Sequence, residues 1–207
     1  MLIAVGGHSR NIGKTSVACG IIAATEELRW QAIKITQHGN HACTTDGAQC
    51  ECDPGDPLHP YALDEQTAAD RTDSGRYLSA GAARSWWLRT AQGELGHAIG
   101  ALKDLLAQAE YTVVESNSLL QFLKPDLYLV VLDFGVTDMK DSSRLYMDRA
   151  DAFVIVNCGI ASPPWPGMPQ RWFQGKPAFA VSPPSYMSQE LAAFMRDRVY
   201  AGNPGNP

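Results

Sequence analysis

Apolar residues along the chain alternate between short continuous runs and stretches with helical spacing. The first run, Leu2–Val5, ends at two glycines, and from Lys14 to about Arg29 apolar residues recur at the spacing of a helix. A second apolar run follows at Trp30–Thr36. A strand, a glycine-containing loop, a helix and another strand form a βαβ unit, which favours a parallel sheet.

The same alternation continues in the second half of the chain. Helices are expected at about 93–109 and 189–200. The four further apolar runs that predict strands are Thr112–Glu115, Leu127–Asp133, Ala152–Asn157 and Ala178–Ser182. Such nearly continuous apolar strands are typical of a sheet with helices on both faces. The pattern predicts a three-layer α/β sandwich with a mostly parallel sheet, built as one domain over residues 1–207.

One segment departs from this order. Residues 37–72 are rich in Gly, Pro, Asp, His and Cys and show no convincing period, so we interpret them as an insertion after the second strand. A structureless stretch of this length needs something that holds it together.

Further along, Trp86-Trp87 is interpreted as packing a helix against the sheet, with a dimer contact as the alternative.

Composition narrows the class of protein. The 207 residues carry a formal net charge of -5, which argues against broad nucleic-acid binding, because such binding normally needs a basic face. No run approaches the ~18 apolar residues of a membrane span, and the N-terminus lacks the cationic leader of a signal peptide. We therefore expect a cytoplasmic protein without membrane contacts, in which cysteines stay reduced.

The strongest chemical signal is the segment from Gly6 to Thr15, which reads Gly-Gly-His-Ser-Arg-Asn-Ile-Gly-Lys-Thr. Glycines let backbone N–H groups turn toward phosphate oxygens, and the following helix offers its positive N-terminal end. Lys14 is placed to reach the β- and γ-phosphates, and the hydroxyl of Thr15 suits Mg²⁺. The strict phosphate-loop pattern has glycine where this chain has His8. The residues expected to bind the phosphates are Gly7, His8, Ser9, Arg10, Asn11, Ile12, Gly13, Lys14, Thr15 and Ser16.

The spacing of this loop resembles that of dethiobiotin synthetase, the related amide-forming synthases of cobalamin assembly, and molybdopterin-guanine dinucleotide biosynthesis protein B. The last family also matches a lysine and a histidine-containing turn at 34–38, an Asp-Ser…Ala-Gly-Ala segment at 73–82, and a strand that ends at Glu115. The resemblance covers about residues 2–160, with the cysteine-rich insertion as an extra. Where the family has Glu-Gly, this chain has Glu115-Ser116.

Carboxylates at strand ends are the candidates for the cation. Glu115 closes an apolar strand, and ligands of open α/β sheets bind at the carboxyl ends of the strands. It is expected to hold Mg²⁺ and to act in catalysis with Lys14, as the resemblance also implies. Asp73, through its family match, and Asp133, through its strand-end position, are alternatives. Asn157 matches a base-contacting asparagine of the dethiobiotin synthetase-like proteins.

Two arginines and two three-residue segments are further candidates beside these carboxylates. Arg10 lies within the loop and Arg76 lies three residues after Asp73, so each has a phosphate contact and a surface ion pair as alternatives. The Ala80–Ala82 turn and residues 116–118 are candidate linings for a substrate pocket. Because no Asn-Lys-x-Asp guanine motif follows Asn157, ATP and GTP both remain open.

Cysteines and histidines crowd together within the insertion. Cys43, Cys50 and Cys52 lie within ten residues, beside three histidines. Thiolates and imidazoles at this density suit Zn²⁺ or, as the second choice, an iron–sulfur centre, and the ligand bonds would replace a missing apolar core. The expected ligand set is Cys43, Cys50, Cys52 and His59, with His38 or His41 as the alternative fourth ligand. A redox pair and a loop with incidental cysteines are the other interpretations.

These observations give one leading hypothesis and two competitors. The leading one is a Mg²⁺-dependent nucleoside triphosphatase with slow turnover, which serves cofactor assembly as the resemblance implies, with a cofactor-assembly protein as partner and a homodimer as an open possibility. The first competitor is an ATP-dependent carboxylate ligase of the dethiobiotin synthetase type. The second is a metallochaperone whose nucleotide state controls release of the metal held by the insertion.

Overall fold

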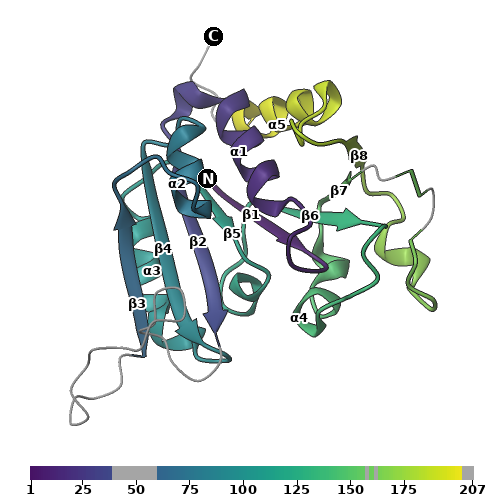
Figure 1. Ribbon diagram of the computed structural model, residues 1–207, viewed down its shortest axis with the longest axis horizontal. Coiled ribbons are helices and arrows are strands. Elements are labelled where there is room, and N and C mark those ends of the chain that lie inside the picture. Colours follow the sequence, from purple (N-terminus) through teal and green to yellow (C-terminus); the bar gives the residue numbers. More distant parts are fainter. Residues whose placement is uncertain (39–59, 157–158, 161–162, 202–207) are drawn as a thin grey trace.

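A single eight-stranded sheet forms the centre of the protein, in the order β3-β4-β2-β5-β1-β6-β7-β8 (Figure 1). The computed structural model describes residues 1–38, 60–156, 159–160 and 163–201. Neighbouring strands are parallel except for β3, which pairs antiparallel with β4. The strands are β1 (Leu2–Gly7), β2 (Gln31–His38), β3 (Tyr61–Gln66), β4 (Arg84–Ala91), β5 (Thr112–Glu115), β6 (Leu127–Asp133), β7 (Ala152–Val156) and β8 (Ala178–Val181).

Helices cover both faces of this sheet. The α-helices are α1 (Lys14–Ala24), α2 (Asp73–Ser79), α3 (Ile99–Leu106), α4 (Asp141–Arg144) and α5 (Gln189–Ala201). Short 3-10 helices join them, namely η1 (Glu26–Leu28), η2 (Leu95–Ala98), η3 (Ser118–Gln121), η4 (Met147–Arg149) and η5 (Gln170–Trp172). Among the described residues, no helix is both long enough and apolar enough to cross a membrane.

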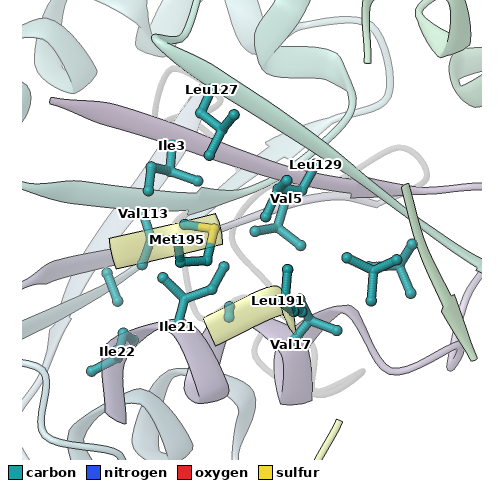
Figure 2. Close-up of a cluster of buried hydrophobic side chains, with 14 of the residues drawn as sticks. Ile3, Val5, Val17, Ile21, Ile22, Val113, Leu127, Leu129, Leu191 and Met195 are labelled. Carbon is teal, nitrogen blue, oxygen red and sulfur yellow. The ribbon is translucent and has the colours of Figure 1, made fainter. Parts of the chain in front are cut away.

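Two apolar clusters, one on each face, hold the three layers together. On one face, α1 and α5 pack on the central strands through residues such as Val17, Ile21 and Leu191 (Figure 2). On the other face, Leu102 and Leu105 of α3 pack in the second cluster. Burial of each such side chain contributes about 1.5–3 kcal/mol, so the sheet between them is a rigid platform for the loops at its edges.

The predicted fold class is confirmed, with one error in the region of the insertion. The prediction found β1, β2, β5, β6, β7 and β8, but part of the segment treated as structureless is the edge strand β3. It also missed α2 and β4. Trp86 and Trp87 lie within β4 and, as successive strand residues, point to opposite faces. Trp86 packs against the apolar cluster that includes Leu102 and Leu105 of α3.

Candidate nucleotide site

A large cavity opens where the carboxyl ends of β1, β2 and β5 meet. The register places Glu115, the last residue of β5, beside Val5 of β1 and Lys34 of β2, and these two strands continue beyond it to Gly7 and His38. The cavity has a volume of about 1070 Å³ and is lined by the loop before α1, by the ends of β2 and β5, and by the starts of α2 and α4. The sheet topology alone brings these segments together, because carboxyl ends of parallel strands share one edge.

The strand that precedes the loop extends further than the sequence suggests. Gly7 is still part of β1, and the side chain of Asn117 binds its backbone on both sides: Gly7 N donates to Oδ1 and Nδ2 donates to Gly7 O, each at 2.9 Å. The next N–H, that of His8, donates to the carbonyl of Val131 at 3.3 Å. These two N–H groups are therefore already used within the protein, and the turn of the loop lies after them.

His8 stands where the strict pattern has glycine, and its side chain points into the protein. Its Nε2 accepts the N–H of Asp133 at 3.1 Å, so Nδ1 carries the proton and donates to the carbonyl of Asp138 at 2.8 Å. The ring also packs on Trp165, with 4.5 Å between ring centroids. Burial lowers the pKa of His8 below its ordinary value. The neutral imidazole thus fixes the loop to the segment that follows β6.

The loop ends at the start of α1, whose first turn faces the cavity without a side-chain cap. Gly13 has φ 91°, a left-handed conformation that favours glycine, and a Cβ there would lie 2.3 Å from the ring of Tyr186. Glycine at position 7 leaves room for the aliphatic part of the Lys14 side chain, because a Cβ on Gly7 would lie 2.9 Å from Cδ of Lys14. The uncapped first turn leaves N–H groups that suit an anion.

Lys14 itself is held across the loop. Its Nζ donates to the carbonyl of Ser9 at 2.5 Å. Burial lowers the pKa of Lys14 to about 8, although the carboxylate of Glu115 acts in the opposite direction. Without a ligand, this ammonium is therefore poorly stabilised, and an anion beside it would raise its pKa again.

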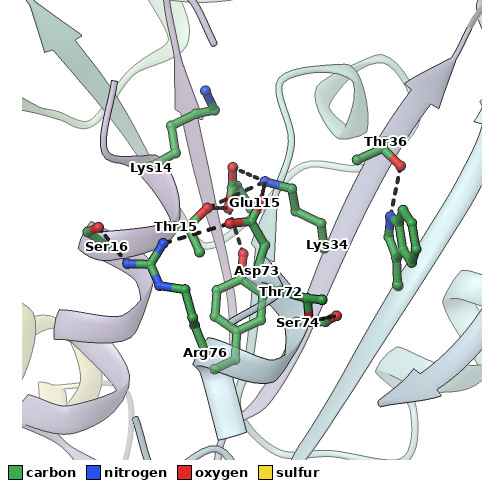
Figure 3. Close-up of polar contacts among 12 residues, drawn as sticks. Lys14, Thr15, Ser16, Lys34, Thr36, Thr72, Asp73, Ser74, Arg76 and Glu115 are labelled. Atoms are coloured by element: carbon green, nitrogen blue, oxygen red, sulfur yellow. Dashed lines mark hydrogen bonds and ion pairs between the residues drawn. The ribbon is translucent and has the colours of Figure 1, made fainter. Parts of the chain in front are cut away.

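Three oxygens converge on one cation next to Lys14 (Figure 3). Nζ of Lys34 lies 2.5 Å from Oε1 of Glu115, 2.8 Å from Oδ2 of Asp73 and 3.5 Å from Oγ1 of Thr15. Thr15 also donates to Oε2 of Glu115 at 2.7 Å. Burial alone would lower the pKa of Lys34, but the two carboxylates raise it above its ordinary value, so the ammonium stays charged.

Supporting contacts fix these carboxylates. Glu115 is buried and accepts a third hydrogen bond, from the hydroxyl of Tyr77 at 2.6 Å. Asp73 lies in the first turn of α2, which Thr72 caps by accepting the N–H of Gly75 at 3.1 Å. Burial opposes ionisation of Asp73, but Lys34 holds the pKa of this carboxyl below its usual value. Both carboxylates therefore point at the ammonium of Lys34.

The cavity is positively charged although the whole chain is acidic. Its lining contains the five cationic side chains of Arg10, Lys14, Lys34, Arg76 and Lys140, against three carboxylates, those of Asp73, Glu115 and Asp141. Burial, followed by Arg10 and Lys34, lowers the pKa of Lys140. Cations that depress one another's pKa in this way favour an anionic ligand.

Most of the predicted phosphate and cation residues come together here, and a few do not. Residues 10–16, Asp73, Arg76, Glu115 and residues 116–118 line the cavity, and Arg76 donates to the hydroxyl of Ser16 at 2.7 Å. The carboxylate of Asp133 instead accepts the N–H of Gly135 at 2.8 Å. The Ala80–Ala82 turn cannot line this pocket, because it bonds through Ala82 to α2 and leads to the amino end of β4.

Other predicted residues lie outside the described part of the chain. These are Asn157 and the proposed metal ligands His41, Cys43, Cys50, Cys52 and His59. Within the described residues, no three His, Cys, Asp or Glu side chains gather as a metal-binding group. The sequence interpretation missed the roles of Tyr77, Lys140 and Tyr186, and it named Asn117 only as part of a candidate pocket lining. Lys34 was named only as part of the family resemblance.

The loop, its helix and the neighbouring acidic strand end define the fold class. The fold is a three-layer α/β sandwich with a glycine-containing loop between β1 and α1. A structure of HypB from Helicobacter pylori in complex with nickel is similar, with 14% sequence identity and a TM-score of 0.49 over 99% of this chain and 90% of that chain. The "apo" form of LpxK from Aquifex aeolicus in complex with ATP has 16% identity and a TM-score of 0.47, over 86% of this chain and 53% of that chain.

Likenesses this distant carry no argument about ligand or activity. This chain also spans only about half of the LpxK chain. Comparison with models of protein families finds no match. Comparison with curated proteins finds none either.

Proposed function

We propose that this protein binds a nucleoside triphosphate together with Mg²⁺ and hydrolyses it slowly, in a role in cofactor assembly like that of molybdopterin-guanine dinucleotide biosynthesis protein B. The observation that carries nucleotide binding is the uncapped first turn of α1, which faces a positively charged cavity beside Lys14. The assembly role rests on the sequence resemblance of residues 2–160.

The proposed phosphate contacts follow from which groups are already in use. The N–H groups of Gly7 and His8 already donate hydrogen bonds to Asn117 and Val131. The phosphates are therefore assigned to the backbone N–H groups from Ser9 to Ser16. Lys14 would exchange the carbonyl of Ser9 for phosphate oxygens. This exchange replaces a neutral partner with an anion and offsets the burial that depresses the pKa of Lys14.

The residues around Lys34 fit a Mg²⁺ ion. Mg²⁺ takes hard oxygen ligands, and the hydroxyl of Thr15 and the carboxylates of Glu115 and Asp73 already converge on a cation, the ammonium of Lys34. When bound, the ion would neutralise charge that develops on the phosphates. In this proposal Thr15 and Glu115 hold the ion, Asp73 assists, and Lys34 moves aside.

Nucleotide calorimetry on a Lys14→Ala variant tests the proposal. Wild-type protein should bind ATP, GTP or both in the presence of Mg²⁺, and Lys14→Ala should abolish binding while leaving thermal stability intact. Lys103→Ala is the matched control, because Lys103 is an exposed lysine of α3 on the other face of the sheet. Equal affinities in the three proteins would refute the proposal.

Two finer assignments remain part of this proposal. Asn157 is proposed to contact the base, since it directly follows β7 in the sequence. The insertion is proposed to bind zinc through Cys43, Cys50 and Cys52, supported by the density of thiols in the sequence. A ligase of the dethiobiotin synthetase type is the second candidate, and residues 116–118 in the cavity lining favour it by offering room for a second substrate.

A further inference from the structure

Lys140, which follows β6, is a cavity-lining cation whose charge is not paired. Its side chain is half-buried and lines the cavity. Within the part of the chain that the structure describes, its ammonium has neither a hydrogen bond nor an ion pair, and Asp138 and Glu115 attract it only from a longer distance. Lys34, in contrast, pairs with two carboxylates, and Lys14 donates to a carbonyl. A half-buried ammonium without a partner favours an anionic ligand.

The backbone of Lys140 is bound to the start of the phosphate loop. Its N–H donates to the carbonyl of His8 at 2.8 Å, and the carbonyl of the next residue, Ser9, accepts the ammonium of Lys14. Consecutive carbonyls of the loop therefore hold the backbone of one lysine and the ammonium of the other. Because the lysine of such a loop reaches the β- and γ-phosphates, Lys140 lies at the end of the loop where the terminal phosphate is expected.

The segment that carries Lys140 is fixed to the loop by two further hydrogen bonds. Nδ1 of His8 donates to the carbonyl of Asp138 at 2.8 Å, and Oγ of Ser9 donates to Oδ2 of the same residue at 2.6 Å. The backbone of Lys140 therefore has a defined position relative to the loop. Electrostatic catalysis depends on charges that are held in place in this way before the reaction begins.

Lys140 approaches the loop from the side opposite to Lys34. In the sheet, β1 lies between β5 and β6. The loop after β1 thus has Glu115 and Lys34 on its β5 side and Lys140 on its β6 side. The charge of Lys140 nevertheless interacts with those of Lys14, Lys34 and Arg10. A phosphate on the loop would therefore have Lys34, or the Mg²⁺ proposed in its place, on one side and Lys140 on the other.

We propose that Lys140 is a further catalytic residue of the hydrolysis, whose ammonium binds the terminal phosphate of the nucleoside triphosphate from the β6 side and neutralises its charge in the transition state. This inference rests on the proposed function. It assigns to Lys140 the oxygens of the terminal phosphoryl group that face away from the ion. Stabilising the charge on these oxygens is the main contribution that a protein makes to phosphoryl transfer.

The step itself is a displacement at the terminal phosphorus. A water oxygen forms a bond to this phosphorus as the bond from the phosphorus to the bridging oxygen breaks, and the electron pair of that bond stays with the nucleoside diphosphate. One proton of the water remains on the phosphate product, and the other passes to solvent. Lys140 keeps its proton throughout, because its role is to supply positive charge.

The test compares variants at position 140 in hydrolysis and in nucleotide binding, with Mg²⁺ and with ATP or GTP, whichever the wild type binds more tightly. Lys140→Met removes the charge and keeps most of the side-chain volume, and Lys140→Arg restores a charge. Lys124→Met is the matched control, because Lys124 is an exposed lysine that precedes the same strand, β6, at its other end. Single-turnover hydrolysis measures the chemical step. Calorimetry compares the triphosphate with the diphosphate, and the diphosphate with and without aluminium fluoride, which imitates the transferring phosphoryl group.

We expect Lys140→Met to lower the rate of the chemical step about a hundredfold, as for removal of one preorganised donor at a transition state. Its affinity for the triphosphate should fall about tenfold, as for loss of a charged hydrogen bond, and its affinity for the diphosphate should not change. Aluminium fluoride should no longer tighten binding of the diphosphate. Lys140→Arg should recover part of the rate, and Lys124→Met should match the wild type in every measurement. Without nucleotide, Lys140→Met should unfold at the wild-type temperature or above, because its ammonium has no partner to lose.

Three results would overturn this role for Lys140: hydrolysis by Lys140→Met at the wild-type rate, an equal loss of affinity for triphosphate and diphosphate, or a rate in Lys140→Arg no higher than in Lys140→Met. The proposed function is tested by the wild type alone. Wild-type protein that binds neither ATP nor GTP, or binds without hydrolysis, refutes the proposed function and this role with it. Binding and hydrolysis that Lys140→Met leaves unchanged refute only the role of Lys140.

Discussion

Replacing Lys34 with methionine should make the stability of the protein depend on Mg²⁺, whereas the stability of the wild type should not. The ammonium of Lys34 lies between Glu115 and Asp73, at 2.5 and 2.8 Å. Methionine keeps most of the volume of the side chain but leaves the two carboxylates without this cation. In the wild type, added Mg²⁺ without nucleotide should change stability little, because Lys34 already occupies the position between the oxygens.

The size of the effect follows from burial. Glu115 is 3% exposed and Lys34 14%, and breaking such a buried pair typically destabilises by about 3–5 kcal/mol. For Lys34→Met we expect a destabilisation at the lower end of this range, because Thr15 and Tyr77 still donate hydrogen bonds to Glu115. Asp73 is 42% exposed and adds at most about 1 kcal/mol. For a chain of this length, about 3 kcal/mol lowers the melting temperature by about 6–12 °C.

Thermal unfolding in matched ionic strength, with and without Mg²⁺, measures this effect. A Mg²⁺ concentration of about 100 times its dissociation constant would restore about 2.7 kcal/mol, nearly the whole loss. The control is the double variant Lys34→Met with Glu115→Gln, in which the main carboxylate is neutral and restoration should disappear. If Lys34→Met responds to Mg²⁺ no more than the wild type does, the three oxygens do not form a cation site.

Three further predictions concern pH, metal and the insertion. Because the pKa of Lys14 is lowered to about 8, the free protein loses this positive charge above about pH 8; nucleotide affinity should then fall as pH rises, by up to about tenfold per unit, with proton uptake in calorimetry, and an affinity that stays constant above about pH 8 would contradict this. Glu115→Gln should keep metal-free nucleotide binding but lose most of the Mg²⁺ enhancement of binding and turnover; an unchanged enhancement would make Asp73 the principal ligand. Metal analysis should find about one zinc per chain, absent after Cys50 and Cys52 are replaced with serine, and metal-free wild-type protein would contradict the zinc proposal.

The elements that the sequence pattern predicted well are those whose environment is uniform. Strands such as Leu127–Asp133 are covered on both faces, so nearly every residue is apolar and the run is conspicuous. The strand β4 escaped prediction because it carries Arg84, Ser85, Arg89 and Thr90 among its apolar residues. These polar residues lie on both faces of the strand, because side chains alternate along it, and so they interrupt the apolar run on each face. β3 was missed because it is an edge strand with a polar half.

The parts of the site that escaped prediction depend on contacts between distant segments. Asn117 binds Gly7 from 110 positions away, and nothing in the local sequence of either residue indicates the other. Tyr77 reaches Glu115 from α2 in the same way. The loop, in contrast, was recognisable because its chemistry is local: glycine, lysine and threonine act within a few residues, directly after a strand. Local motifs can therefore be read from one sequence, whereas the partners that orient them require the fold.

The electrostatics of the cavity bear on the order in which ligands bind. In the ligand-free protein, Lys34 pairs with both Glu115 and Asp73, so an incoming Mg²⁺ would gain two carboxylates only by displacing an ammonium that has no other anionic partner among the described contacts. A triphosphate changes this balance, since its oxygens offer Lys34 a new anionic partner and offer the ion further ligands. Displacement of Lys34 then exchanges one ion pair for another and leaves no buried charge alone. Cation and nucleotide should therefore bind together, each raising the affinity for the other, and Lys34 is the residue through which they are coupled.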